Sequence, residues 1–259
     1  MLNKKTLGLA GCVLALAALP AVASAAAALP KPVAAEGPNF SGAWEDPNPQ
    51  DQIRPAGSPP LPQEVPPPPL KEPHLAEWQA RQKVNAERTA RGDPPVGNGV
   101  LCIPGGMPSM MKATFPIEVL QTPGQVTIIN EAFAQVRRIY LNEKQIKVED
   151  AEPLFWGHSV GHWEGNTLVV NTIGLKENVR MRDVPHSPNM KVDERITVTS
   201  PTTFEDQMTV TDPEYLTKPW TWTYKFVRKA DYKINEFVCE DNRVYADPVT
   251  GKQKLRIGQ

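Results

Sequence analysis

The pattern of hydrophobic and polar positions divides the chain near residue 100. After that point, short runs rich in Val, Ile, Thr, Tyr and Trp alternate with turn residues, which is typical of β-strands. No helical pattern separates these runs, so they predict an all-β fold, an antiparallel meander that forms a barrel or a sandwich. The predicted strands cover residues 117–121, 126–131, 135–141, 158–163, 167–173, 194–199, 204–211, 220–227 and 232–238.

Before residue 100 the chain is irregular and rich in proline. Runs such as residues 66–69 favour extended backbone and cannot form the interior of a sheet. Two segments interrupt this stretch: residues 40–44 predict a short strand, and residues 73–91 predict one helix with a thin apolar stripe. We therefore divide the chain into a Pro-rich N-terminal arm over residues 26–99 and an antiparallel β domain over residues 100–259.

Residues 1–25 resemble a secretory signal peptide. Two lysines precede an apolar run at residues 7–19, and Ala23-Ser24-Ala25 forms a small-residue cleavage site. The run is shorter than the roughly 20 apolar residues of a membrane span, so we expect no transmembrane segment after signal removal. A lipobox-like pattern within the run ends at Cys12, but the cleavage-site pattern favours ordinary secretion over lipid anchoring. We predict a periplasmic or secreted protein.

Charge and cysteine content narrow the possible partners. The chain has 28 Lys and Arg, two of which leave with the signal peptide, against 29 Asp and Glu. Without clustered positive charge, nucleic acid is not an expected partner.

Two cysteines remain in the mature chain, Cys102 and Cys239, and in an exported protein an isolated pair is most simply one disulfide. Two separate buried thiols are the alternative.

Residues 157–172 allow two incompatible interpretations. They contain a G-x-S-x-G pentapeptide, which would make Ser159 a hydrolase nucleophile if a helix followed it. Gly165-Asn166 instead predicts a two-residue hairpin turn followed by another strand. We therefore interpret Ser159 as a strand residue on the face opposite to His158 and His162.

His158 is the candidate acid or base of this strand. It could exchange protons with a ligand if a carboxylate such as Glu194 or Glu164 oriented it. Glu194 and Arg195 must face opposite sides of their strand, so one of them points inward and needs a partner. His162 and Glu164 are expected at the solvent face beside the turn. A metal site would lack a third and fourth ligand at suitable spacing, so we predict no metal and no cofactor.

A second group of residues could contact a small-molecule ligand. His186 lies in a loop held between prolines, where ligand contacts are frequent. Trp220, Trp222 and Tyr224 share one face of a late strand, which suits either a core or an aromatic ligand wall. Three functions stay open: a binding module for an apolar or aromatic molecule, a cofactor-independent lyase, isomerase or hydratase that uses the histidine and carboxylate above, and an envelope protein with a structural or interaction role.

Several motifs together resemble an uncharacterised family of exported bacterial proteins. The most specific is the G-H-S-V-G-x-W-E-G-x-T-L-V-V block at residues 157–170, and residues 40–44, 102–108, 137–140 and 238–240 accompany it. This resemblance implies export and no particular activity. Gly42-Ala43-Trp44 ahead of a meander also resembles the G-x-W start of lipocalin-like β-barrels, which implies such a barrel.

Overall fold

A computed structural model describes residues 36–47, 65–93, 101–112, 115–239, 244–246 and 253–255. The predicted signal peptide with Cys12 lies outside these residues, as do the proline runs within residues 48–64. In the described part, the chain is mostly strands with one α-helix, α1 (His74–Ala90).

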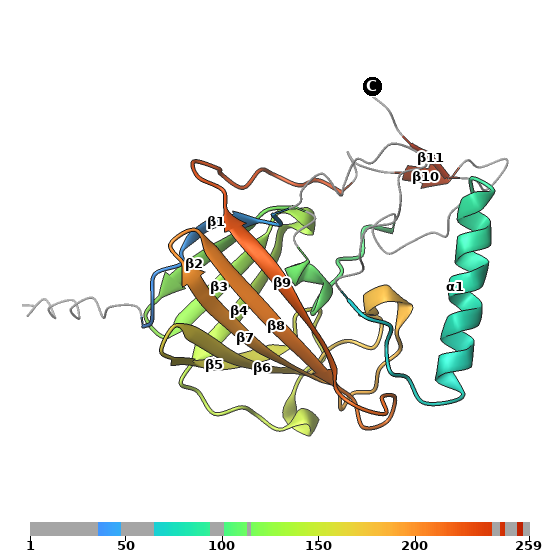
Figure 1. Cartoon of the computed structure of the whole chain (residues 1–259), viewed down its shortest axis with the longest axis horizontal. Coiled ribbons are helices and arrows are strands. Elements are labelled where there is room, and N and C mark those ends of the chain that lie inside the picture. Colours follow the sequence, from blue (N-terminus) through green and yellow to red (C-terminus); the bar gives the residue numbers. More distant parts are fainter. Residues whose placement is uncertain are drawn as a thin grey trace, which may run out of the picture. The chain divides into compact units, whose positions relative to one another are not determined.

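Nine strands form a closed barrel (Figure 1), which confirms the predicted lipocalin-like all-β fold. Eight neighbouring pairs are antiparallel, and the β4–β5 pair is parallel. An odd number of strands cannot close with antiparallel pairs alone, so the meander must be broken at one pair. The strands are β1 (Gly42–Glu45), β2 (Ile117–Thr122), β3 (Gln125–Asn130), β4 (Gln135–Leu141), β5 (His158–Glu164), β6 (Thr167–Ile173), β7 (Lys191–Ser200), β8 (Thr203–Thr211) and β9 (Trp220–Arg228).

The barrel core follows the strand period of two. In β7 the buried positions alternate with exposed ones, and β8 and β9 show the same alternation. Large apolar side chains from these strands meet the interior faces of the others, and the core reaches from one end of the barrel to the other. Its largest fully buried apolar members include Trp44, Phe40, Phe204, Phe226, Ile117, Ile128, Ile139 and Leu168.

The two ends of the barrel differ in their connections. At one end, two-residue turns at residues 123–124, 165–166 and 201–202 join neighbouring strands. At the other end lie the connections of residues 174–190 and 212–219, together with the passage from β1 to β2. We call this second end the long-loop end. The crossover of residues 142–157 returns to it, which lets β5 run parallel to β4.

β1 closes the barrel although it lies in the predicted N-terminal arm. It pairs with both β2 and β9. Trp44 is fully buried, and the Arg228 guanidinium lies 4.3 Å from its ring centroid. Gly42 has φ +123°, and a Cβ there would lie 2.6 Å from Nη1 of Arg228. The G-x-W pattern therefore reflects a backbone position that needs glycine beside a buried tryptophan.

Residues 101–112, which we call the mouth segment, cross the long-loop end. The Gly106 amide donates to Oε1 of Gln135 (3.0 Å) at the start of β4, and Nδ2 of Asn130 donates to the Met110 carbonyl (2.7 Å) at the end of β3. The segment ends in the short 3₁₀ helix η3 (Ser109–Met111). Its three methionines are almost completely buried: Met107, Met110 and Met111.

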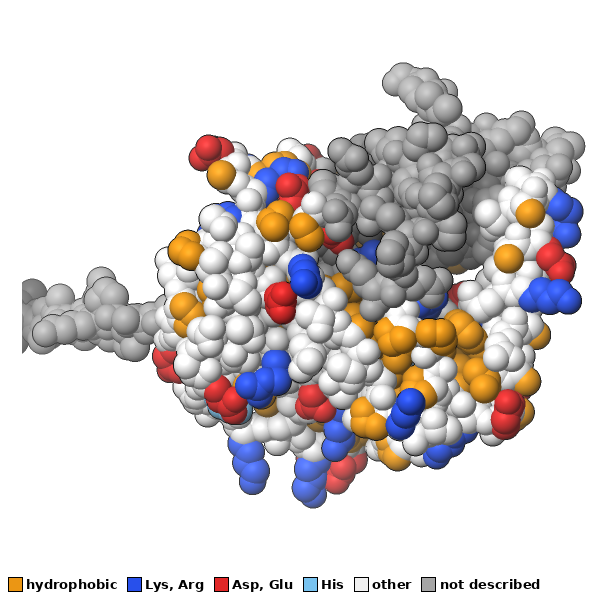
Figure 2. All heavy atoms as spheres, in the orientation of Figure 1, with side chains coloured by type: hydrophobic (Ala, Val, Ile, Leu, Met, Phe, Trp, Pro, Cys, Tyr) orange, Lys and Arg blue, Asp and Glu red, His pale blue; other side chains and the backbone are white. Residues whose placement is uncertain are grey.

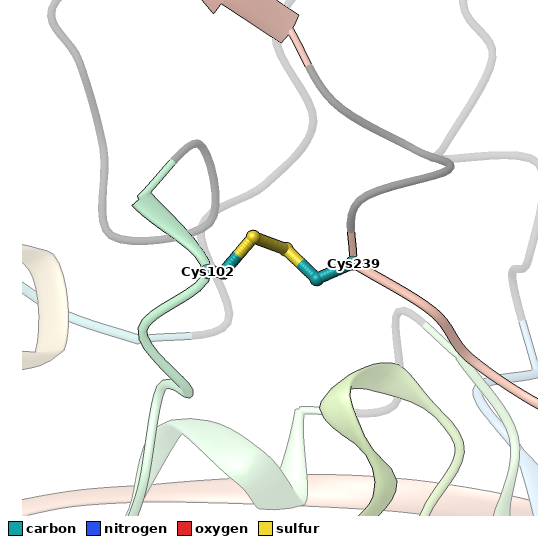
Figure 3. Close-up of a disulfide and its surroundings, with 2 residues drawn as sticks. All are labelled: Cys102 and Cys239. Carbon is teal, nitrogen blue, oxygen red and sulfur yellow. A yellow bond between two sulfur atoms is a disulfide. The ribbon is translucent and has the colours of Figure 1, made fainter.

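A disulfide joins Cys102 of the mouth segment to Cys239 (Figure 3), with their Cα atoms 5.7 Å apart. This confirms the predicted pair. The strand predicted over residues 232–238 is wrong, because β9 already pairs with β8 and β1 and the barrel has no free edge beside it. The segment is held instead by Glu131, whose Oε2 accepts hydrogen bonds from the Tyr232 hydroxyl (2.5 Å) and the Asn235 amide (2.9 Å).

Helix α1 lies outside the barrel, as its thin apolar stripe predicts. Trp78 is its buried residue, and Nε1 of Trp78 donates to the Arg182 carbonyl (3.0 Å) near the 3₁₀ helix η6 (Met181–Asp183).

Two further 3₁₀ helices, η4 (Ala132–Ala134) and η5 (Val148–Asp150), lie in connections between strands. Among the described residues, no helix is long and apolar enough to cross a membrane. Two short strands, β10 (Val244–Ala246) and β11 (Gln253–Leu255), pair outside the barrel.

Candidate binding site at the long-loop end

Ser159 is buried inside the barrel and is not presented as a nucleophile. Its Oγ lies 2.8 Å from Oγ1 of Thr172 and accepts a hydrogen bond from Nε of Arg137 (3.2 Å). The turn at Gly165-Asn166 leads directly into β6, as predicted. A hydrolase elbow needs a helix at this point, and a strand occupies it.

His158 faces outward and does not meet Glu194. Its Nδ1 lies 2.8 Å from Oε1 of Gln145, and its ring stacks on Tyr140 with centroids 5.7 Å apart. Gln145 also donates to the His158 carbonyl (3.2 Å), so the histidine helps to hold the 142–157 crossover against β5. The predicted pairing of His158 with Glu194 is wrong, since the two side chains lie on opposite faces of the barrel wall. No observation tests His158 as a base.

His162 and Glu164 are exposed beside the β5–β6 turn, as the alternating pattern predicts. Glu164 accepts a hydrogen bond from Arg195 (3.0 Å), and Nε2 of His162 lies 3.3 Å from the other oxygen of this carboxylate. The hydrogen bond from Arg195, followed by that from His162, lowers the pKa of Glu164. This cluster lies at the end of the barrel where two-residue turns join the strands, away from the residues that line the barrel interior.

Glu194 points inward and pairs with Arg137. Nη1 of Arg137 donates to Oε1 of Glu194 (2.8 Å), Nη2 donates to Oε2, and Nη2 also donates to Oγ1 of Thr172 (2.9 Å). Both side chains of the pair are at most 1% exposed, so they form a buried two-point ion pair. Sequence reasoning missed Arg137, although strand alternation places it on the same face as Gln135 and Ile139.

Asp206 adds a second carboxyl to this interior cluster. It is fully buried on β8, directly opposite Tyr224 and Ile196 in the strand register. Burial first, and then the negative charge of Glu194, raises the pKa of Asp206 well above its usual range, while Arg137 acts in the opposite direction. One guanidinium cannot neutralise two buried carboxylates, so burial beside Glu194 favours the protonated, neutral form of Asp206.

A small pocket opens at the long-loop end and brings together two of the predicted ligand residues, His186 and Trp220. We call it the mouth pocket. Its volume of about 20 Å³ is close to that of one water molecule. Apart from His186 and Asp212, its wall is apolar. The lining residues are Pro108, Val179, Met181, Val184, Pro185, His186, Met190, Val210, Asp212, Leu216 and Trp220.

Hydrogen bonds fix His186 and its neighbours in the pocket wall. His186 is 5% exposed, its Nδ1 lies 2.9 Å from the Ser187 carbonyl, and its Nε2 lies 3.1 Å from the Lys176 carbonyl. Asp212 accepts hydrogen bonds from the Ser187 amide (2.7 Å) and hydroxyl (3.0 Å). These contacts tie the 174–190 loop to the end of β8, so one wall of the pocket is rigid.

Trp220, Trp222 and Tyr224 face the barrel interior in a row. Their ring centroids lie 5.0 Å apart for Trp220 and Trp222, and 6.1 Å apart for Trp222 and Tyr224. The row begins in the mouth pocket and ends opposite Asp206. Nε1 of Trp220 donates to the Pro66 carbonyl (2.9 Å), which fixes the arm at this rim. The predicted aromatic stripe therefore connects the mouth pocket with the buried polar cluster.

The surface charges give no large field of one sign on the face that Figure 2 shows. Lys and Arg side chains are interspersed there with Asp and Glu, and hydrophobic side chains gather between the barrel rim and α1. In the part of the chain that the structure describes, no group of three or more His, Cys, Asp and Glu side chains is arranged to hold a metal ion.

No protein-family model matches the chain, and no curated protein matches it. The resemblance of residues 157–170 to a family of exported bacterial proteins stays a prediction.

Proposed function

We propose that this protein is exported and binds a small apolar or aromatic molecule through the long-loop end of its barrel. The mouth pocket is the observation that carries the proposal, because it places apolar walls and a few fixed polar groups at the mouth of a β-barrel. The disulfide between Cys102 and Cys239 supports export, since such bonds persist in oxidising compartments.

The mouth pocket must expand to admit a ligand, because about 20 Å³ holds no more than a water molecule. Two of its walls are the methionines Met181 and Met190. Methionine is unbranched and changes rotamer easily, so these side chains can move while the hydrogen-bonded wall at His186 stays in place. A closed apolar pocket with a flexible side is consistent with a ligand that is largely hydrophobic.

Filling the pocket with one larger side chain tests the proposal. Val210 faces the pocket, and its neighbour on β8, Thr209, faces outward. We expect Val210→Phe to weaken binding of the fluorescent probe N-phenyl-1-naphthylamine by about tenfold, equivalent to about 1.4 kcal/mol. Thr209→Phe adds the same side-chain ring on the outer face and should leave the affinity unchanged. Equal affinities for wild type and folded Val210→Phe would contradict the proposed site.

A further inference from the structure

Asp206 and Trp222, which both face the barrel interior, carry buried polar atoms without a hydrogen-bond partner among the residues that the structure describes. Nε1 of Trp222 is buried without an acceptor, and both carboxyl oxygens of Asp206 are buried without a donor. Trp222 is 4% exposed and Asp206 is 0% exposed. Buried groups of this kind are rare, and a water molecule or a ligand atom as the missing partner is one explanation for them.

The two groups lie next to each other on the interior wall. Asp206 is opposite Tyr224 in the β8–β9 register, and Trp222 lies one inward position before Tyr224 on β9, diagonal to Asp206. Met208, which faces Trp222 across the register, fills the adjacent inward position of β8. The unsatisfied donor and the unsatisfied acceptors therefore belong to diagonal inward positions of two paired strands, between the middle and the inner end of the aromatic row.

Protonation of Asp206 leaves one acceptor free. The protonated oxygen can donate to Glu194, whose negative charge helps to raise the pKa of Asp206. The second oxygen then remains an acceptor without a donor, and Nε1 of Trp222 remains a donor without an acceptor. A hydroxyl group is the smallest ligand group that can donate to the free oxygen of Asp206 and also accept a hydrogen bond from Nε1 of Trp222.

We propose that the polar patch formed by Asp206 and Trp222 binds a neutral hydroxyl group of a ligand whose apolar ring system lies along Trp220 and Trp222. This inference rests on the binding function proposed above and adds the chemical class of the ligand. The class is neutral because Arg137 and Glu194 already balance each other's charge. A charged ligand group would add an uncompensated buried charge beside them.

Two probes of nearly equal shape test the inference. 1-Naphthol carries the hydroxyl group, and 1-methylnaphthalene replaces it with a methyl group. We expect the wild-type protein to bind 1-naphthol about tenfold more tightly, because the methyl group leaves the buried donor and acceptor unpaired. Affinities are measured by titration of tryptophan fluorescence and checked by calorimetry.

Two Trp→Phe variants on the same strand supply the matched comparison. Trp222→Phe removes the free donor and should make the affinities for 1-naphthol and 1-methylnaphthalene nearly equal, whatever the change of ring contact does to both. Trp220→Phe removes an N–H that already donates to Pro66 and should keep the preference. Asp206→Leu removes the acceptor and, if it folds, should behave as Trp222→Phe does.

The possible results separate the two proposals. Binding of both probes with equal affinity overturns the hydroxyl patch and leaves the binding function intact, as does a preference for 1-naphthol that survives in Trp222→Phe. In either case the buried groups are satisfied by water alone. Tighter binding of 1-naphthylmethylammonium than of 1-naphthol contradicts the inference that the ligand group at the patch is neutral. Failure of the wild-type protein to bind any of these probes contradicts the binding function itself.

Discussion

At the scale of single residues, Arg137 and Glu194 form the least replaceable contact inside the barrel. Each side chain is almost completely buried, so removal of one partner leaves a charge that no water reaches. We predict that Arg137→Met lowers the free energy of unfolding by about 3–5 kcal/mol, measured by urea denaturation. The double variant Arg137→Met/Glu194→Leu should recover most of this loss, because no buried charge remains.

The exposed ion pair between Arg195 and Glu164 is the control for this prediction. Both side chains are 49% exposed, so solvent and salt screen their attraction. Arg195→Ala should therefore change the free energy of unfolding far less than Arg137→Met does. The interior pair would have no special role if Arg137→Met cost no more than Arg195→Ala.

Asp206 makes the stability of the protein depend on pH in a defined direction. Its raised pKa means that the folded state keeps a proton that the unfolded state releases above about pH 4. The contribution of Asp206 to stability is therefore fully present below that pH and is lost as the pH rises toward its folded pKa. Asp206→Asn keeps a donor toward Glu194 and does not titrate.

We predict that Asp206→Asn gains stability relative to the wild-type protein as the pH rises from 4 to 7. Urea denaturation of both proteins at several pH values measures the difference in the free energy of unfolding. Parallel pH profiles for the two proteins would show that Asp206 is not held in its neutral form inside the barrel.

Residue roles were the hardest feature to predict from the sequence. Alternation correctly placed Ser159 opposite His162, and it required an inward partner for either Glu194 or Arg195. It could not identify that partner, because Arg137 lies three strands away in the barrel order and nothing local distinguishes it from Arg138. The pairing of His158 with Glu194 was wrong for the same reason: its polar partner Gln145 comes from a crossover with no strand pattern.

At the scale of elements, the mouth segment depends on its disulfide. It carries few backbone hydrogen bonds of its own, and Cys102 ties it to a segment 137 residues later in the sequence. We predict that Cys102→Ser/Cys239→Ser lowers the free energy of unfolding by about 2–5 kcal/mol. Hydrogen exchange should accelerate more at the Gly106 and Met107 amides than at the amides of β7 and β8. Equal acceleration throughout would mean that the disulfide does not hold this segment in particular.

Most elements could be predicted because their local signals agree with the fold. The helix at residues 73–91 and the strands from residue 117 to residue 227 match the observed elements to within a few residues at each end. The predicted strand at residues 232–238 has a suitable composition, but a strand also needs a partner. β1 takes the edge of β9 that this segment would need, and only the closed topology reveals this competition.

At the scale of the whole molecule, the barrel has one end closed by tight turns and one end built from long connections. Turn signals such as Gly165-Asn166 predict the first end from the sequence. The second end could not be predicted, because it brings together the mouth segment, the 174–190 loop and the start of β9 from distant parts of the chain. His186 and Trp220 were separate candidates until the fold placed them in one pocket.

The methionines allow a direct test of ligand entry at this end. The chain has 7 methionines, and all of them except Met1 are buried in the described structure. Met181 and Met190 line the mouth pocket, Met208 faces Trp222, and the others lie in the mouth segment. Methyl NMR of methionine-labelled protein therefore reports on the proposed path.

We predict that titration with 1-naphthol shifts the methyl resonances of Met181, Met190 and Met208 at the concentrations that quench tryptophan fluorescence. This result would place the bound molecule between the mouth pocket and the interior polar patch. Quenching of fluorescence at saturation with all methionine resonances unmoved would contradict binding through the long-loop end.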